Sequence, residues 1–245
     1  MQRSLDGRRV AFLTANEGVE QIELTSPWKA VQDAGGEPVH LAPEKGEVQG
    51  FDHLDKADVF EATTAVKNAS AGDFDALVLP GGVANPDQLR TDADAISFIR
   101  SFVDQGKPIA VICHGPWTLV EAKVVAGRSL TSWPSLRTDI ENAGGTWVDQ
   151  EVVVSEDGPN TIVSSRNPDD LPAFESAMVD VFAKDAAVPD PPTVDEVMEE
   201  QRRRDDLPDP SDDPQHQQVV DDEEAALADQ AVANDAPPEA RPDIG

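Results

Sequence analysis

Short apolar segments alternate with segments of helical periodicity along residues 10–184. Residues 21–34, 92–105 and 169–184 repeat apolar side chains at helical spacing, and glycines end the first two of these segments. The apolar segments are short and rich in β-branched residues, as in strands covered on both faces; they lie at 10–14, 38–41, 76–79, 108–112, 152–154 and 161–165. This alternation predicts an α/β domain with a mainly parallel central sheet. Residues 43–70 are mixed and polar, and we expect a hairpin there.

The composition changes at Ala186. From that residue to the end, the chain has 18 acidic residues, 4 arginines, 9 of its 20 prolines and no aromatic residue. Such a segment cannot bury enough apolar area to offset its chain entropy. We therefore predict one globular domain at residues 1–185 and a disordered, acidic, proline-rich tail at 186–245.

The single cysteine, Cys113, lies between a predicted strand and a predicted helix. His114-Gly115 is typical of a tight turn, and Pro116 suits the first position of a helix. A thiol at such a corner lies close to helix N–H groups, which favour the thiolate. The arrangement is that of a nucleophile elbow. A buried cysteine that serves only as a small hydrophobic residue is the alternative.

Three polar features follow predicted parallel strands. The turn at 17–23, Gly81-Gly82 and Cys113 each come directly after one of these strands. In open α/β sheets, ligands bind beyond the carboxyl ends of the strands. We therefore expect these three features to meet at one site.

The formal charge of −29 is unfavourable for binding nucleic acid or an anionic membrane surface. One cysteine excludes an internal disulfide, in keeping with a reducing compartment. The apolar run after the charged N-terminus is too short for a signal peptide, and no segment is long enough to span a bilayer. We expect a cytoplasmic protein that needs no metal or organic cofactor, since no cluster of ligand residues is evident.

Several segments together resemble the DJ-1/PfpI family, in order and over most of residues 9–184, and most closely its PfpI branch. They are Ala15-Asn16-Glu17, residues 19–23 with Pro27, residues 79–90, Ile112-Cys113-His114-Gly115-Pro116, Thr131-Ser132-Trp133-Pro134, Asp139 with Asn142-Ala143-Gly144, and Ser164-Ser165-Arg166. The resemblance implies a flavodoxin-like three-layer sandwich, as in class I glutamine amidotransferases, and usually a dimer or hexamer. The tail has no counterpart in the family pattern.

The resemblance also implies roles for individual residues. Cys113 matches the family's nucleophile, and Glu23 matches a protonated glutamate that donates a hydrogen bond to the sulfur. His114 matches the general base proposed in the PfpI branch. Asp87 replaces a glutamate that contacts this histidine from a neighbouring subunit, and its side chain is one methylene shorter. Gly82 and Gly115 are suited to donating backbone N–H groups to an oxyanion.

Other readings of these residues remain open. Glu20 and Glu23 are also explained as acids at a helix N-terminus, and Asp87 as a helix-starting acid after a proline. We expect His40 and His53, outside the motifs, to have no role. Trp117 and Trp133 are expected to pack in the interior or to line the pocket.

The resemblance favours a glyoxalase or protein deglycase that acts on methylglyoxal or on glycated Cys, Lys and Arg. A PfpI-type intracellular peptidase is one alternative, and a non-enzymatic redox sensor or holdase is another. The domain has no histidine after His114, so the histidine–glutamate pair of a glutamine amidotransferase is missing and that activity is excluded. The expected partners are a small carbonyl substrate or a glycated protein, and further copies of the chain.

Overall fold

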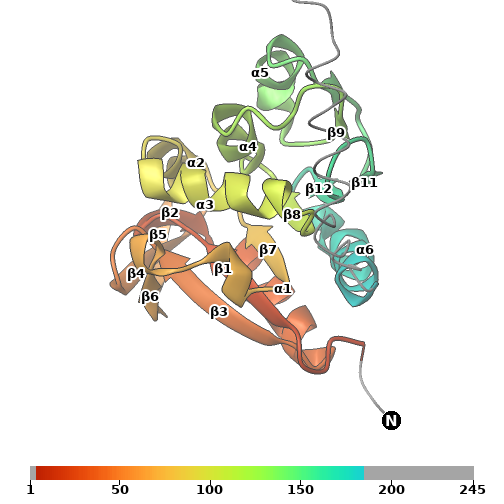
Figure 1. Cartoon of the computed structure of the whole chain (residues 1–245). Helices are drawn as coiled ribbons and strands as arrows, with labels where there is room; N and C mark the ends of the chain where they lie inside the picture. Colours follow the sequence, from red (N-terminus) through yellow and green to blue (C-terminus); the bar gives the residue numbers. More distant parts are fainter. Residues whose placement is uncertain (1–3, 185–245) are drawn as a thin grey trace, which may run out of the picture. The chain divides into compact units, whose positions relative to one another are not determined.

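The computed structural model describes residues 4–184, and the predicted tail lies outside them. Seven strands form the central sheet, in the order β11-β12-β8-β7-β1-β3-β6 (Figure 1). Only β11 runs antiparallel to its neighbour, and the other strands pair in parallel. The strands are β1 Arg9–Leu13, β3 Glu37–Ala42, β6 Thr64–Ala65, β7 Ala76–Leu79, β8 Ile109–Ile112, β11 Val152–Ser155 and β12 Ile162–Ser165.

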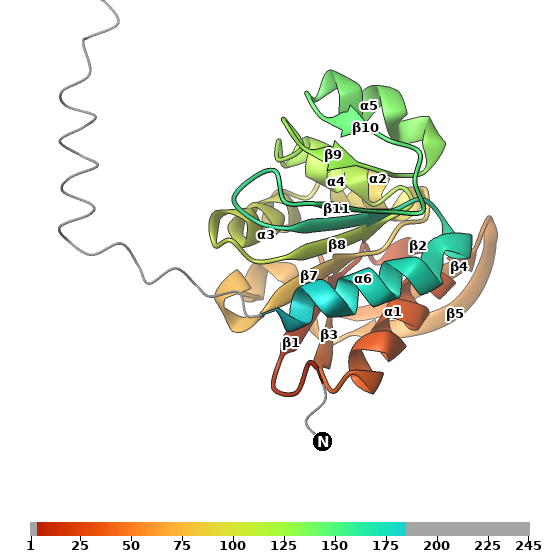
Figure 2. The same ribbon diagram turned by 90° about the vertical axis from the view of Figure 1, so that its right-hand side faces the viewer.

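Helices cover both faces of this sheet. On one face α3 (Ala93–Asp104) and α4 (Pro116–Glu121) contribute to one apolar cluster, together with side chains from the strands. On the other face α1 (Gln21–Asp33) and α6 (Leu171–Ala183) pack side by side over a second cluster (Figure 2). The predicted three-layer α/β sandwich is therefore confirmed.

The segments predicted to be helical begin and end close to the expected residues. The Asp92 side chain caps α3 by accepting a hydrogen bond from the Ala95 N–H at 2.8 Å. The central strands β1, β7 and β8 are almost wholly buried, which explains why they are apolar without alternation.

A second sheet of three strands lies beside the start of α1. Its strands β4 (Gly46–Asp52) and β5 (Asp55–Ala62) form the expected hairpin, which turns at His53-Leu54. The third strand, β2 (Glu17–Glu20), pairs in parallel with β4 and was not predicted, because the sequence there suggested only a turn. This pairing brings the hairpin turn to the first turn of α1, which positions one side of the candidate site.

The remaining elements are short. They are α2 Ala84–Leu89, α5 Arg137–Asn142, the strand pair β9 Ser129–Leu130 and β10 Thr146–Trp147, and the 3₁₀ turns η1 Val66–Asn68, η2 Ala71–Asp73, η3 Pro134–Leu136 and η4 Pro168–Asp170. Within residues 4–184, none of the helices has the length and apolar composition needed to cross a membrane.

Candidate active site

Cys113 lies at the sharp turn between β8 and α4, as the sequence predicts. Its φ of 62° falls in the left-handed region that side chains other than glycine seldom adopt. Two backbone hydrogen bonds hold this conformation: the Cys113 N–H donates to the Ser165 carbonyl at 3.0 Å, and the Trp133 N–H donates to the Cys113 carbonyl at 2.8 Å. The thiol is thereby held beyond the carboxyl end of β8, in the geometry of a nucleophile elbow.

Glycines let neighbouring backbone approach this turn. A Cβ on Gly81 would lie 2.5 Å from Glu23 Oε2 and 2.7 Å from the Cys113 Cβ, so no side chain fits there. Gly82 has a φ of 83°, and a Cβ there would lie 2.3 Å from the Gly18 carbonyl oxygen. The strand-ending glycines therefore allow the β7 turn, the first turn of α1 and the elbow to meet.

Glu23 lies in the first turn of α1, with its side chain buried beside Cys113. Its Oε2 accepts a hydrogen bond from the Gly81 N–H at 2.8 Å, whereas Oε1 is buried without a hydrogen-bond partner among the described residues. Burial raises the pKa of Glu23 to about 8, although the contacts with Cys113 and Gly81 act in the opposite direction. Glu23 therefore carries a proton at neutral pH.

Cys113 is itself buried, and burial raises the pKa of its thiol. A negative charge on Glu23 raises that pKa further, whereas the backbone N–H groups of Gly82 and His114, which bond to the sulfur, lower it. Since Glu23 is protonated at neutral pH, its repulsion is absent there. The two buried groups thus act as a coupled pair that keeps at least one proton.

His114 follows Cys113 directly and contacts it through the side chain. Its Nδ1 lies 3.2 Å from the Cys113 Sγ. The imidazole stacks on Trp133, with ring centroids 5.5 Å apart, and burial lowers its pKa to about 4. His114 is therefore neutral at pH 7, so one of its ring nitrogens is an acceptor.

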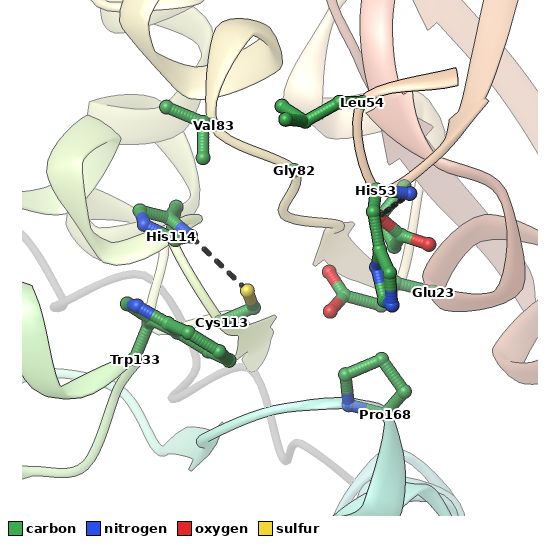
Figure 3. A pocket seen from close by; sticks show the side chains of 10 residues that line it. Glu23, His53, Leu54, Gly82, Val83, Cys113, His114, Trp133 and Pro168 are labelled. Atoms are coloured by element: carbon green, nitrogen blue, oxygen red, sulfur yellow. Dashed lines mark hydrogen bonds and ion pairs between the residues drawn. The ribbon is translucent and has the colours of Figure 1, made fainter. Parts of the chain in front are cut away.

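Cys113 opens into a pocket of about 280 Å³ (Figure 3). The carboxyl group of Glu23 points toward the sulfur, and the ring of Trp133 lies on the same side of the pocket as His114. Apolar side chains form most of the remaining wall. The pocket is lined by Glu20, Glu23, His53, Leu54, Gly82, Val83, Cys113, His114, Trp133 and Pro168.

The turn of the β4–β5 hairpin contributes His53 and Leu54 to this pocket, contrary to our expectation for His53. His53 has a φ of 58° and a side chain that is 82% exposed. Its N–H donates to Glu20 Oε2 at 3.1 Å, and its Nδ1 lies 3.7 Å from the same oxygen. No motif near His53 indicates this role. The sequence did predict a hairpin in this region, but only the pairing of β2 with β4 directs the turn of that hairpin to the pocket.

Glu20, Asp52 and His53 also have the composition of a metal-ligand set. Each offers one ligand atom, and these atoms lie within 4.8 Å of one another. Asp52 and His53 are exposed, and exposed acidic groups commonly lie together without a metal. We therefore assign no metal to this cluster.

Two of the six predicted site residues, Gly115 and Asp87, do not take the place at the site that the resemblance implies. Gly115 donates its N–H to the Ile112 carbonyl at 2.9 Å, so this N–H closes the turn and is not free for an oxyanion. Asp87 is exposed on α2 and does not line the pocket. Its contact with the histidine of a neighbouring subunit stays a prediction. The structure therefore brings together Cys113, His114, Glu23 and Gly82.

His40 lies apart from this site. It is buried, with its Nε2 2.9 Å from the Thr14 Oγ1 and its Nδ1 3.2 Å from the Glu61 carbonyl oxygen. Burial lowers its pKa to about 4. His40 thus occupies a hydrogen-bonded position in the interior.

Comparison with known sequences gives consistent matches over the described domain. Residues 8–181 match the sequence model of the DJ-1/PfpI family. The chain is 42% identical over 168 residues to General stress protein 18 of Bacillus subtilis, covering 67% of this chain and 92% of that protein. It is 40% identical to Protein/nucleic acid deglycase 2 of Escherichia coli (68% and 93% covered) and 41% identical to Deglycase PfpI of Pyrococcus furiosus (68% and 94% covered).

Solved structures agree with this assignment of the fold. A two-domain protein from Anabaena variabilis, with DJ-1/ThiJ/PfpI-like and ferritin-like domains, matches with a TM-score of 0.65 and 30% identity. That match covers 75% of this chain and 50% of the other. Schizosaccharomyces pombe DJ-1 matches with a TM-score of 0.61 and 23% identity, covering 70% and 90%.

Proposed function

Because the chain belongs to the DJ-1/PfpI family, we propose that it is a cysteine-dependent enzyme that acts on reactive carbonyl compounds, as a glyoxalase or protein deglycase. The observation that carries the proposal is the contact of a buried thiol with a protonated carboxyl group and a neutral imidazole in one pocket. Two relatives named as deglycases are about 40% identical to this chain, and the family match at residues 8–181 includes every residue of the site.

In the first step, the Cys113 sulfur attacks the aldehyde carbon of methylglyoxal, and the thiol proton passes to His114 as the carbon–sulfur bond forms. A carbon–sulfur bond forms, and the carbonyl electron pair moves to the oxygen. That oxygen takes a proton from Glu23 Oε1, which gives a neutral hemithioacetal. The N–H of Gly82, already directed at the sulfur, is placed to stabilise the developing negative charge.

The second step is an internal redox reaction that needs no external oxidant. The C–H proton of the first carbon moves to the second carbon, and the hydroxyl proton moves to the second oxygen, so the first carbon is oxidised to a thioester and the second is reduced to an alcohol. The proton taken up by His114 returns to Glu23. Water then hydrolyses the thioester, which releases lactate and the free thiol. With a glycated amine as substrate, the Cys113 sulfur bonds to the carbinolamine carbon as the carbon–nitrogen bond breaks, and the amine leaves with the proton that His114 took from the thiol.

The test is to incubate the full chain with methylglyoxal and to measure lactate. We expect the Cys113→Ala variant to lose at least about a thousandfold in rate, because covalent catalysis needs the thiol. Val154→Ala, a truncation on the exposed face of β11, serves as the control and should retain full activity. Equal lactate from Cys113→Ala, or none from the unaltered chain, would contradict the proposal.

A further inference from the structure

Glu20 is a buried acid at the start of α1. It occupies the N-cap of α1, yet its side chain makes no capping hydrogen bond. Instead the carboxyl group turns to the hairpin, where Oε2 accepts the His53 N–H, and the residue is only 7% exposed. Glu20 thus lies at the helix N-terminus, as expected for an acid that complements the helix dipole, and its carboxyl group also lines the pocket.

The charges around the pocket are unbalanced. None of its lining residues is Lys or Arg, and Glu23 is neutral at pH 7. The negative charge of Glu20 is close enough to influence Glu23. His53, beside Glu20, is mostly exposed to solvent. The pocket therefore combines one negative charge, apolar walls and a nucleophile.

A second polar group lies next to the sulfur. The carboxyl group of Glu23 points toward Cys113 (Figure 3), and among the described residues its Oε1 has no hydrogen-bond partner other than that thiol. A polar group of a ligand beside the sulfur can therefore add a hydrogen bond to this buried oxygen.

We propose that Glu20 makes this pocket selective for ligands that carry a positive charge over ligands that carry a carboxylate or phosphate. The cationic nitrogen lies toward Glu20, and its alkyl stem packs against Leu54 and Val83. A charge held in a poorly solvated site acts more strongly than one on the surface. The inference refines the proposed function but depends on it only for Cys113 as the reacting group.

Labelling of the single cysteine tests this without any turnover. Methanethiosulfonates that carry an ammonium, a methyl or a sulfonate group react with a thiolate to form a disulfide and release methanesulfinate. Intact mass gives the rate for each reagent, with EDTA present to exclude metal effects. The ratio of the ammonium rate to the sulfonate rate cancels the intrinsic reactivity of Cys113.

We expect Glu20→Gln to lower this ratio about five- to tenfold. The matched control is Glu17→Gln, which removes the same charge from an exposed acid of β2 that pairs with Lys56 and does not line the pocket. It should change the ratio less than about twofold. Equal effects of the two variants would overturn the inference, because the selectivity would then come from the overall charge.

A second measurement uses the unaltered chain, should Glu20→Gln fail to fold. Butylammonium, butanol and butyrate have similar sizes and different charges. Butylammonium should protect Cys113 from iodoacetamide at concentrations where the other two do not. Equal protection by all three, or preferential protection by butyrate, would overturn the inference. Absence of lactate formation together with cation selectivity would refute the proposed function and leave the pocket assignment standing.

Discussion

The two sides of the pocket differ in how they are built. The side with Cys113 consists of a turn at the centre of the seven-stranded sheet, where β8 is fully buried and both flanking backbones are hydrogen-bonded to the elbow. The opposite side is the turn of a hairpin, where Leu54 is 88% exposed. The reacting groups therefore depend on the rigid core, whereas the shape of the entrance depends on an exposed turn.

The largest effect should come from crowding the buried side. In Gly81→Ala the new Cβ would approach Glu23 Oε2, the Cys113 Cβ and the Ile112 carbonyl oxygen within 2.5–2.8 Å. Because the last of these is backbone, the elbow must shift. We expect a loss of about a hundredfold in lactate formation and about 1–3 kcal/mol in the free energy of unfolding.

The control for that variant is Gly72→Ala, on the exposed turn η2. A Cβ there would contact only the flexible Ser70 hydroxyl, at 3.3 Å. Both activity and stability should stay near those of the unaltered chain, within about 0.5 kcal/mol. If the two variants behaved alike, the claim that the elbow tolerates no displacement would fail.

An intermediate effect should come from the proton on Glu23. The pKa of Glu23 is raised to about 8, so the folded protein holds a proton that the unfolded chain has already released. The free energy of unfolding therefore falls as pH rises toward 8. His40 and His114, with pKa values lowered to about 4, act in the opposite direction only below their ordinary value of 6.5. Between pH 6.5 and 8 the Glu23 contribution is about 2 kcal/mol.

Denaturant unfolding of the unaltered chain and of Glu23→Gln over this pH range measures that contribution. Because Gln cannot ionise, the variant should show a flatter dependence of stability on pH. Parallel curves for the two proteins would mean that Glu23 is already ionised at neutral pH, and the proposed proton donor would be lost.

The smallest effect should come from the hairpin side. Leu54→Ala removes an exposed side chain, so we expect the free energy of unfolding to change by less than about 0.5 kcal/mol. The KM for carbonyl substrates should rise about threefold, because apolar contact at the pocket entrance is lost. Steady-state kinetics with a loss in kcat instead of KM would show that this turn takes part in the chemistry.

The contrast between the two sides also explains what the sequence could predict. The segments that form the central sheet are continuous apolar runs. Cys113 and Gly82 follow two of them closely, while Glu23 lies in the helix after a third, so their meeting at one edge follows from local pattern and parallel topology. His53 reaches the site only because β2 pairs with β4, a contact between distant segments that no local pattern encodes.

Glu20 and Gly115 show a second limit of the sequence. The sequence pattern places Glu20 at a helix N-terminus, but only the folded structure shows that its carboxyl group accepts the His53 N–H and lines the pocket. Likewise, the position of Gly115 after the nucleophile suggested an N–H that is free to bind an oxyanion, but in the structure this N–H donates to the Ile112 carbonyl. Such competition among hydrogen-bond partners is decided by the folded structure.

The central claim is that the thiol of Cys113 performs the reaction, and graded alkylation tests it most directly. Because the chain has a single cysteine, the mass of the protein after treatment with iodoacetamide gives the fraction of Cys113 that is blocked. We predict that lactate formation from methylglyoxal falls in proportion to this fraction and reaches zero at complete alkylation. Undiminished lactate formation by fully alkylated protein would contradict the account.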